Sequence, residues 1–173
     1  MTNEAKKYVY FDSPIGRMLI AGNSTALTHI HFVGGAHPVE PEPDWEMDRE
    51  IFKEAIGQLQ AYFEGKLKAF DLPLRLEGTA FQIDVWSALQ EIPYGETVSY
   101  AEIARRIGRP KAVRAVGAAN GQNPVSIIVP CHRVIGSNGS LTGYGGGLKN
   151  KEALLALEQG RVASLASQQS LFD

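Results

Sequence analysis

Residues 125–134 of the chain read Val-Ser-Ile-Ile-Val-Pro-Cys-His-Arg-Val. The apolar run at 125–129 is nearly continuous, which is typical of a buried strand. Proline cannot donate a hydrogen bond to a sheet, so we expect the strand to end at Pro130. This prediction places Cys131, the only cysteine of the chain, where a buried strand passes into a loop.

The neighbours of Cys131 make it a candidate nucleophile. Cationic groups nearby favour the thiolate form of a cysteine, and His132 and Arg133 follow directly. A free cysteine can equally serve as a small buried apolar side chain. The stretch alone leaves both interpretations open.

Length and composition are those of an ordinary globular protein. The chain has 173 residues, 44% hydrophobic and 21% charged, which is enough for one domain or two small ones. A single cysteine excludes a disulfide framework and fits a reducing compartment. The N-terminal residues lack the apolar core of a signal peptide, and no apolar run approaches membrane-spanning length. We therefore expect a cytoplasmic, nucleoid-associated protein without a membrane segment.

Charge is distributed very unevenly along the chain. Residues 1–102 carry 16 carboxylates against 8 lysines and arginines, whereas residues 103–151 carry 8 basic residues and no carboxylate. The second composition favours an anionic partner, and a polyphosphate is the first candidate. The acidic N-terminal part is a poor candidate for the binding face.

Residues 1–77 predict a small domain without a chemical constellation. Sequence patterns predict strands at 8–12, 18–21 and 27–33, a helix over 50–63 and a short edge strand at 72–76. His29 and His31 share one face of the third strand, so they could bind a metal ion together with His37. A half-exposed strand face is the plainer interpretation of the same residues.

Residues 78–160 predict a helical domain. Thr79 with Gln82, and Ser99 with Glu102, match capping boxes that open helices. The helix after Ser99 and a further helix at 112–119 flank a glycine-containing turn, which is typical of a helix-turn-helix. The second of these helices carries small residues and one outward cation, Arg114, instead of the polar side chains that read base edges. It could approach a narrow groove closely or simply pack against another helix.

Two features follow the cysteine. A glycine-rich loop at 141–147 does not match a phosphate-binding spacing, but its glycines would let the backbone approach a flat ligand, with Tyr144 as one wall. A helix is expected at 150–157, with Glu158 at its C-terminal end. Negative charge is unfavourable there, which indicates that Glu158 has a specific partner.

These motifs together resemble the O6-alkylguanine-DNA alkyltransferases, or methylated-DNA–protein-cysteine methyltransferases. The matching segments are Arg-Ala-Val-Gly at 114–117, Asn-Pro at 123–124, Pro-Cys-His-Arg-Val at 130–134, Gly-Tyr at 143–144, Gly-Gly-Leu at 146–148 and Glu158. The resemblance implies an α+β fold: an N-terminal ribonuclease-H-like α/β domain at 1–77 and a C-terminal winged-helix-like domain at 78–160. Some relatives hold zinc with N-terminal cysteines that this chain lacks, so no metal or cofactor is expected.

The resemblance also implies a reaction. Cys131 would accept an alkyl group from O6 of a flipped-out guanine in double-stranded DNA, or from O4 of thymine. His132 would deprotonate Cys131 through a water, and Glu158 would orient His132. The bridging water is expected because neighbouring side chains on an extended chain point apart. The thioether product is inert, so each molecule would act once.

The remaining roles concern DNA and the alkylated base. Tyr100 would help rotate the nucleotide and protonate the departing guanine, and Arg114 would fill the vacated stack. Asn123 would act as a hinge between the small-residue helix and the cysteine segment. The pocket would be lined by Val134, Tyr144, Gly145 and Gly146. Because some relatives have serine where Gly145 stands, the range of alkyl sizes is open.

Three other functions are considered. A non-catalytic lesion-binding relative would replace Cys131. A cysteine hydrolase would need a histidine from elsewhere in the chain, and only His29, His31 and His37 are left. A transcription regulator would present polar base readers and usually dimerise, whereas we expect a monomer.

Residues 161–173 are expected to form a flexible tail. Gln168, Ser170, Leu171 and Phe172 resemble the sliding-clamp-binding motif of bacterial replication and repair proteins, although Gln169 stands where leucine is frequent. In that interpretation Leu171 and Phe172 would fill an apolar pocket of the clamp. A frayed terminus, or a tail that folds back on the domain, is the plainer interpretation.

Overall fold

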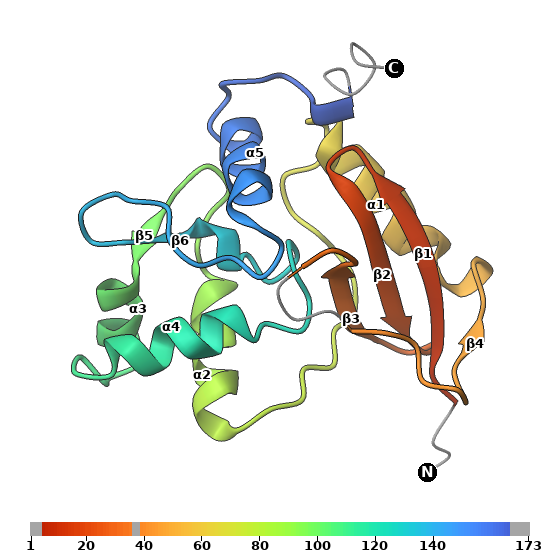
Figure 1. The fold of residues 1–173 in the computed structure, drawn as a ribbon, viewed down its shortest axis with the longest axis horizontal. Helices are drawn as coiled ribbons and strands as arrows, with labels where there is room; N and C mark the ends of the chain where they lie inside the picture. Colours follow the sequence, from red (N-terminus) through yellow and green to blue (C-terminus); the bar gives the residue numbers. More distant parts are fainter. Residues whose placement is uncertain (1–4, 36–38, 167–173) are drawn as a thin grey trace.

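The computed structural model describes residues 5–35 and 39–166, which form two parts side by side (Figure 1). A sheet with one helix forms the N-terminal part, and a group of short helices forms the C-terminal part. One apolar core runs through both parts without interruption. The mixed α+β architecture that the sequence predicts is confirmed.

The N-terminal part is a four-stranded sheet in the order β3-β2-β1-β4. Its elements are β1 (Lys7–Ser13), β2 (Gly16–Gly22), β3 (Leu27–Phe32), β4 (Glu46–Met47), the 3-10 helix η1 (Glu50–Phe52) and α1 (Lys53–Phe63). β1 pairs antiparallel with β2, β2 pairs antiparallel with β3, and β4 is parallel to β1. The predicted strands and helix are therefore present. The expected edge strand at 72–76 is reduced to a single bridge between Leu74 and Leu27.

The C-terminal part consists of short elements. In chain order they are α2 (Ala80–Leu89), β5 (Val98–Ser99), α3 (Tyr100–Arg106), α4 (Val113–Gly121), the 3-10 helix η2 (Cys131–Arg133), β6 (Val134–Ile135) and α5 (Leu148–Glu158). β5 and β6 pair in parallel, so the segment before α3 lies beside the segment that follows the cysteine. α5 stands between this part and the N-terminal sheet (Figure 1).

The two predicted helix starts differ in detail. At α2 the capping box is complete, because Thr79 Oγ1 accepts from Gln82 N and Gln82 Oε1 accepts from Thr79 N. At α3 Ser99 Oγ accepts from Glu102 N at 3.0 Å. The side chain of Glu102, however, pairs with the two arginines at 105 and 106. A nearby cation is the stronger partner for this carboxylate.

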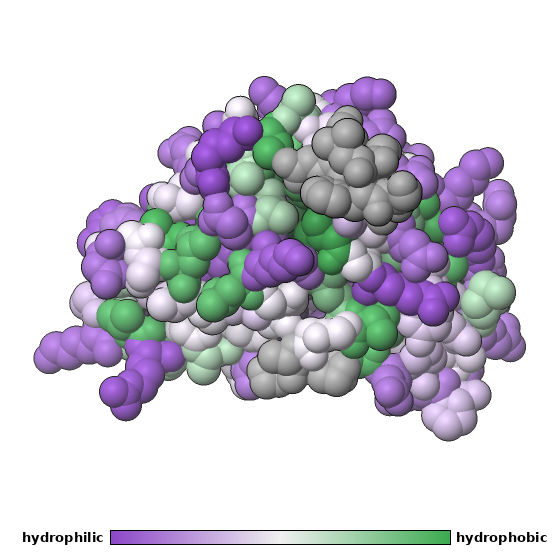
Figure 2. All heavy atoms as spheres, turned by 45° about the horizontal axis from the view of Figure 1, so that its top comes forward, coloured by the Kyte–Doolittle hydropathy of each residue, from purple (hydrophilic) through white to green (hydrophobic). Residues whose placement is uncertain are grey.

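α3 and α4 form the predicted helix-turn-helix. Trp86 Nε1 of α2 donates to Ala119 O at 2.9 Å and holds α4 in place. Figure 2 shows hydrophilic side chains projecting at the end of the molecule where Figure 1 places the turn between α3 and α4. Six basic residues of the segment 103–151 are exposed, namely Arg105, Arg106, Arg109, Lys111, Arg114 and Lys149. Arg105 and Arg106 pair with Glu102, so Arg109, Lys111, Arg114 and Lys149 are the exposed charges of this segment that Glu102 does not neutralise.

The predicted strand at 125–129 is wrong. Only its beginning pairs with the sheet: Ile30 N donates to Pro124 O and Ser126 N donates to Ile30 O, both at 2.9 Å. The chain then turns at Ile127, whose φ of +75° lies in the left-handed region. A β-branched residue is strained there. The run is apolar because most of this turn is buried. Hydrophobic periodicity alone cannot distinguish a buried turn from a buried strand.

Asn123 closes this buried turn. Its Nδ2 donates to Val129 O at 2.7 Å, and its Oδ1 accepts from Val125 N at 3.0 Å. The two bonds satisfy backbone groups that a strand would have paired within a sheet. The cysteine segment is thus attached to the edge of β3 on one side and to Asn123 on the other.

Two predictions concern residues outside the ranges that the structure describes. The clamp-motif residues Gln168, Ser170, Leu171 and Phe172 lie outside the described residues, as does His37. Within residues 5–35 and 39–166, no helix has the length and apolar character needed to cross a membrane.

The backbone after α1 packs closely against residue 163, and two glycines allow this contact to be tested. Gly65 after α1 and Gly108 after α3 have φ of +76° and +75°. A Cβ at Gly65 would collide with the backbone oxygen of Ala163, whereas a Cβ at Gly108 meets nothing within 4 Å. Gly108→Ala should cost about 1–2 kcal/mol from backbone strain alone, and Gly65→Ala should cost clearly more. Urea unfolding of both variants measures the difference, and equal losses would contradict the predicted collision.

Candidate active site

Cys131 begins η2 at the junction of the two domains. Its backbone N donates to Val129 O at 2.8 Å across Pro130, which makes a tight turn. The residue is 4% exposed, and a cavity of about 360 Å³ opens beside it. Both domains contribute to the cavity wall, including His29, His31, Asn120, Asn123, Gly145 and Gly146. The thiol therefore faces a space that can hold a ligand group.

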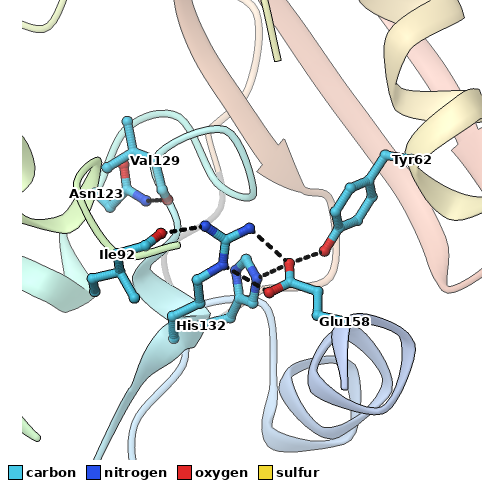
Figure 3. Close-up of polar contacts among 7 residues, drawn as sticks. Tyr62, Ile92, Asn123, Val129, His132 and Glu158 are labelled. Carbon is cyan, nitrogen blue, oxygen red and sulfur yellow. Dashed lines mark hydrogen bonds and ion pairs between the residues drawn. The ribbon is translucent and has the colours of Figure 1, made fainter. Parts of the chain in front are cut away.

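The carboxylate of Glu158 is the centre of a buried hydrogen-bond network (Figure 3). Its Oε2 accepts from Tyr62 Oη at 2.5 Å, from His132 Nε2 at 2.7 Å and from Arg133 Nη2 at 3.1 Å. Its Oε1 accepts from Arg133 Nε at 2.7 Å. Burial alone would raise the pKa of Glu158, but His132 and Arg133 lower it to about 2. The inference that Glu158 has a specific partner is confirmed.

The bond to Glu158 determines the tautomer of His132. A carboxylate accepts only, so Nε2 carries the proton. Burial lowers the pKa of His132, against the opposing effect of Glu158, and the ring is neutral. Its Nδ1 is then a bare acceptor, and it is buried without a hydrogen-bond partner among the described residues. Nδ1 of His132 can therefore accept a proton.

Burial disfavours the thiolate form of Cys131. Burial raises its pKa to about 11, and the side chain of Asn123 and the charge of Lys151 offset this only in part. The two adjacent residues do not offset the effect of burial, because Arg133 is engaged by Glu158 and the pKa of His132 is lowered. The nucleophile needs a base. A water between Cys131 and His132 was expected because side chains of neighbouring residues on an extended chain point apart. That reason does not apply, because the two residues belong to a 3-10 helix.

The two side chains predicted to contact DNA do not line the cavity of about 360 Å³. Tyr100 nevertheless lies near Cys131, because burial and then the neighbouring thiol raise the pKa of Tyr100. Arg114 is exposed on the outer face of α4. Tyr100, the first residue of α3, is partly exposed and its Oη donates to Thr142 O at 2.9 Å. This bond ties α3 to the glycine-rich loop. Both side chains are on the helix-turn-helix side of Cys131.

The glycine-rich loop at 141–147 contributes Gly145 and Gly146 to the wall of the cavity beside Cys131. Tyr144 is buried with its ring edge against Phe32 of β3, at 6.4 Å between centroids. A Cβ on Gly146 would lie 2.5 Å from the Phe32 ring and 2.7 Å from the Tyr144 ring, so only glycine fits. A Cβ on Gly145 would meet nothing closer than Gly121 O at 3.7 Å. Gly146 thus permits packing between domains, whereas Gly145 leaves open space in the cavity wall.

Three residues of the site had no predicted role. Tyr62 lies within the helix predicted over 50–63, but no sequence signal marks its hydroxyl. Arg133 was identified as a neighbour of Cys131 but not as a ligand of Glu158. Lys151 is fully buried and donates to Val134 O at 2.6 Å and Thr142 O at 2.8 Å; burial lowers its pKa to about 8. Its position seven residues before Glu158, on the same helix face, was a usable signal.

The metal site considered at His29, His31 and His37 is not tested, because His37 lies outside the described residues. Among the described residues, no group of three or more His, Cys, Asp or Glu side chains is placed to hold a metal ion. The rings of His29 and His31 lie 5.8 Å apart on β3, and His29 is also close to the Trp45 ring at 5.9 Å. Burial lowers the pKa of His29 to about 4. His29 therefore lies between two aromatic rings on this face of the sheet.

Two family models match almost the whole chain. The ribonuclease-like domain of 6-O-methylguanine DNA methyltransferase matches residues 6–76, and the DNA-binding domain of the same family matches residues 80–160. A methylated-DNA–protein-cysteine methyltransferase of Methanosarcina acetivorans is 57% identical over 151 residues, covering 87% of this chain and 97% of that protein. The protein of the same name in Mycobacterium tuberculosis is 54% identical over 156 residues, covering 90% and 93%.

Solved structures agree with this assignment. The crystal structure of Mycobacterium tuberculosis OGT in complex with DNA superposes with a TM-score of 0.86 at 51% identity, covering 96% of this chain and 99% of that one. An O6-methylguanine DNA methyltransferase from Methanococcus jannaschii superposes with a TM-score of 0.61 at 26% identity, covering 87% and 93%. The ribonuclease-like and DNA-binding domains that the sequence predicted are both present, and the chain belongs to the 6-O-methylguanine DNA methyltransferase family.

Proposed function

We propose that this protein repairs DNA by moving an alkyl group from O6 of guanine to the sulfur of Cys131, once per molecule. The observation that carries the proposal is the set Cys131, His132 and Glu158. A lone thiol borders a cavity, and the next residue is a neutral histidine with a free Nδ1 and a carboxylate on Nε2. This is the arrangement of nucleophile, base and orienting group that activates a thiol.

The chemistry can be written from these groups. His132 Nδ1 takes the proton of Cys131, directly or through a water, and the sulfur attacks the alkyl carbon. The carbon–O6 bond breaks, its electron pair stays on O6, and guanine takes up a proton, for which Tyr100 is the proposed donor. The thiol has become a thioether and the base is ordinary guanine. A thioether is a poor leaving group, so the acceptor is used up.

DNA would be engaged by the helix-turn-helix. α4 buries Val116, Ala119 and Asn120 and presents small residues and Arg114 outward. A smooth helix suits close approach to the minor groove, and Arg114 can occupy the space of a flipped nucleotide. The exposed basic residues around the turn supply the phosphate contacts. The acidic N-terminal domain would remain off the DNA.

Replacing the acceptor should separate chemistry from binding. Cys131→Ser should abolish alkyl transfer, because a serine hydroxyl is a much weaker nucleophile, while affinity for a duplex with one O6-methylguanine stays near wild type. Intact-protein mass spectrometry after incubation with this duplex measures transfer as one added methyl group, and fluorescence anisotropy measures binding. A Ser variant that still gains a methyl group would exclude Cys131 as the acceptor, and a wild-type protein that gains none would overturn the proposed function.

Arg114 should matter most where a base stack must be opened. Unstacking a base costs a few kcal/mol, so Arg114→Ala should slow single-turnover transfer from duplex DNA far more than transfer from a single strand. Arg109→Ala is the matched control, because it removes an exposed charge of the same segment without removing the proposed wedge. That control should weaken binding to both substrates similarly. If Arg114→Ala slowed both substrates by the same factor, the residue would be only a phosphate contact.

A further inference from the structure

We propose that Tyr62 of the N-terminal domain is a positioning residue for this reaction, whose hydroxyl fixes the orientation and the proton affinity of His132 through Glu158. The inference rests on the proposed function and deepens it. It assigns a part in the chemistry to the domain that contributes neither the nucleophile nor the DNA-binding helix.

The ring of Tyr62 is held rigidly. It is fully buried at the end of α1, with centroid distances of 5.5 Å to Phe63, 5.3 Å to Phe70 and 6.3 Å to Tyr94. Aromatic contacts at these distances define a single ring position. A phenylalanine would fill the same space. The hydroxyl is therefore not needed for packing, and burying it without a partner would be costly.

That hydroxyl is placed on the oxygen that His132 uses. Tyr62 Oη and His132 Nε2 both donate to Oε2 of Glu158, at 2.5 and 2.7 Å. Figure 3 shows the carboxylate of Glu158 between the two side chains, with Tyr62 reaching it from the opposite domain. A carboxylate oxygen has two lone pairs in its plane. Tyr62 and His132 make the two short bonds to Oε2, and Arg133 Nη2 makes a longer one at 3.1 Å. With Tyr62 and Arg133 on this oxygen, the direction left for the His132 N–H is restricted, and so is that of Nδ1 on the far side of the ring.

The same contact affects how strongly His132 holds a second proton. The hydroxyl hydrogen of Tyr62 points at Oε2 and disperses part of the negative charge that would stabilise an imidazolium. Burial and the nearby Glu158 raise the pKa of Tyr62 well above 10, so the hydroxyl stays a donor. Removing it should make His132 more basic. The titratable and charged groups that face Glu158 and His132 from the packed elements are Tyr62, Tyr94, Cys131, Arg133, Tyr144 and Lys151.

Only Tyr62 and Arg133 among these bind Glu158 directly besides His132. Arg133 is held by both carboxylate oxygens and by Ile92 O, so it fixes the plane of the carboxylate. Tyr62 is the group that can tune the network without changing its net charge. The hydrogen bond from Tyr62 to Glu158 can therefore be removed or strengthened by substitution, and the two changes should affect His132 in opposite directions.

The test uses the full-length protein with Tyr62→Phe and, as a matched control, Tyr94→Phe. Tyr94 belongs to the same aromatic cluster, but its hydroxyl is not one of the donors to Glu158. The imidazole of His132 is titrated by NMR with labelled histidine, its signal being assigned by its loss in His132→Gln. Single-turnover methyl transfer from an O6-methylguanine oligonucleotide is measured in parallel.

In Tyr62→Phe the titration midpoint of His132 should move to higher pH, and transfer at neutral pH should slow about tenfold, an effect within reach of one hydrogen bond to a charged group. Tyr94→Phe should change neither.

Incorporating 3-fluorotyrosine at position 62 should move the midpoint to lower pH, because its more acidic hydroxyl is a stronger donor. This variant serves as the test if Tyr62→Phe fails to fold. An unchanged midpoint in both position-62 variants, or an equal change in Tyr94→Phe, overturns the inference. The titration needs no DNA, so its outcome is independent of whether the wild type transfers a methyl group.

Discussion

The site depends on the ionised carboxylate of Glu158 inside the protein. A buried charge is tolerated only when its lone pairs are occupied by donors, and Glu158 has four donor contacts from three side chains. These side chains come from α1, in one domain, and from η2, in the other. Leaving such a charge without its partner typically costs about 3–5 kcal/mol. The placement of η2, and with it the placement of Cys131, is therefore coupled to the docking of the two domains.

Much of this arrangement was predictable from the sequence, and the reasons for success are specific. The family resemblance implied that His132 and Glu158 act together beside Cys131, and the unfavourable place of Glu158 at a helix end indicated a specific partner. The structure brings Glu158 and His132 within 2.7 Å. The starts of α2 and α3 followed from residues at helix boundaries, Thr79 and Ser99, whose side chains act within one turn. Local rules work there because the interacting groups are three residues apart.

The features that the sequence did not predict depend on contacts between groups that are far apart in the chain. Tyr62 and Glu158 are 96 residues apart, and a tyrosine on an apolar helix stripe carries no sign of its hydrogen-bond partner. The sequence left the environment of Cys131 open for a related reason. Adjacent cations predict a thiolate only when their charge is free, and here Arg133 is engaged by Glu158 from across the fold. The strand at 125–129 failed because a buried turn closed by Asn123 gives the same apolar pattern as a buried strand.

The buried turn and the carboxylate network are two parts of one constraint on the nucleophile. Ile127 is held at a strained φ by Asn123 and by the edge of β3, so the backbone that leads to Cys131 has little freedom. On the other side of the cysteine, His132 and Arg133 are bound to Glu158. A thiol whose pKa is about 11 reacts at neutral pH only if a base is held at the right place when the substrate arrives. Rigidity on both sides of Cys131 provides that condition, and both restraints require the N-terminal domain: β3 supplies the edge, and α1 supplies Tyr62.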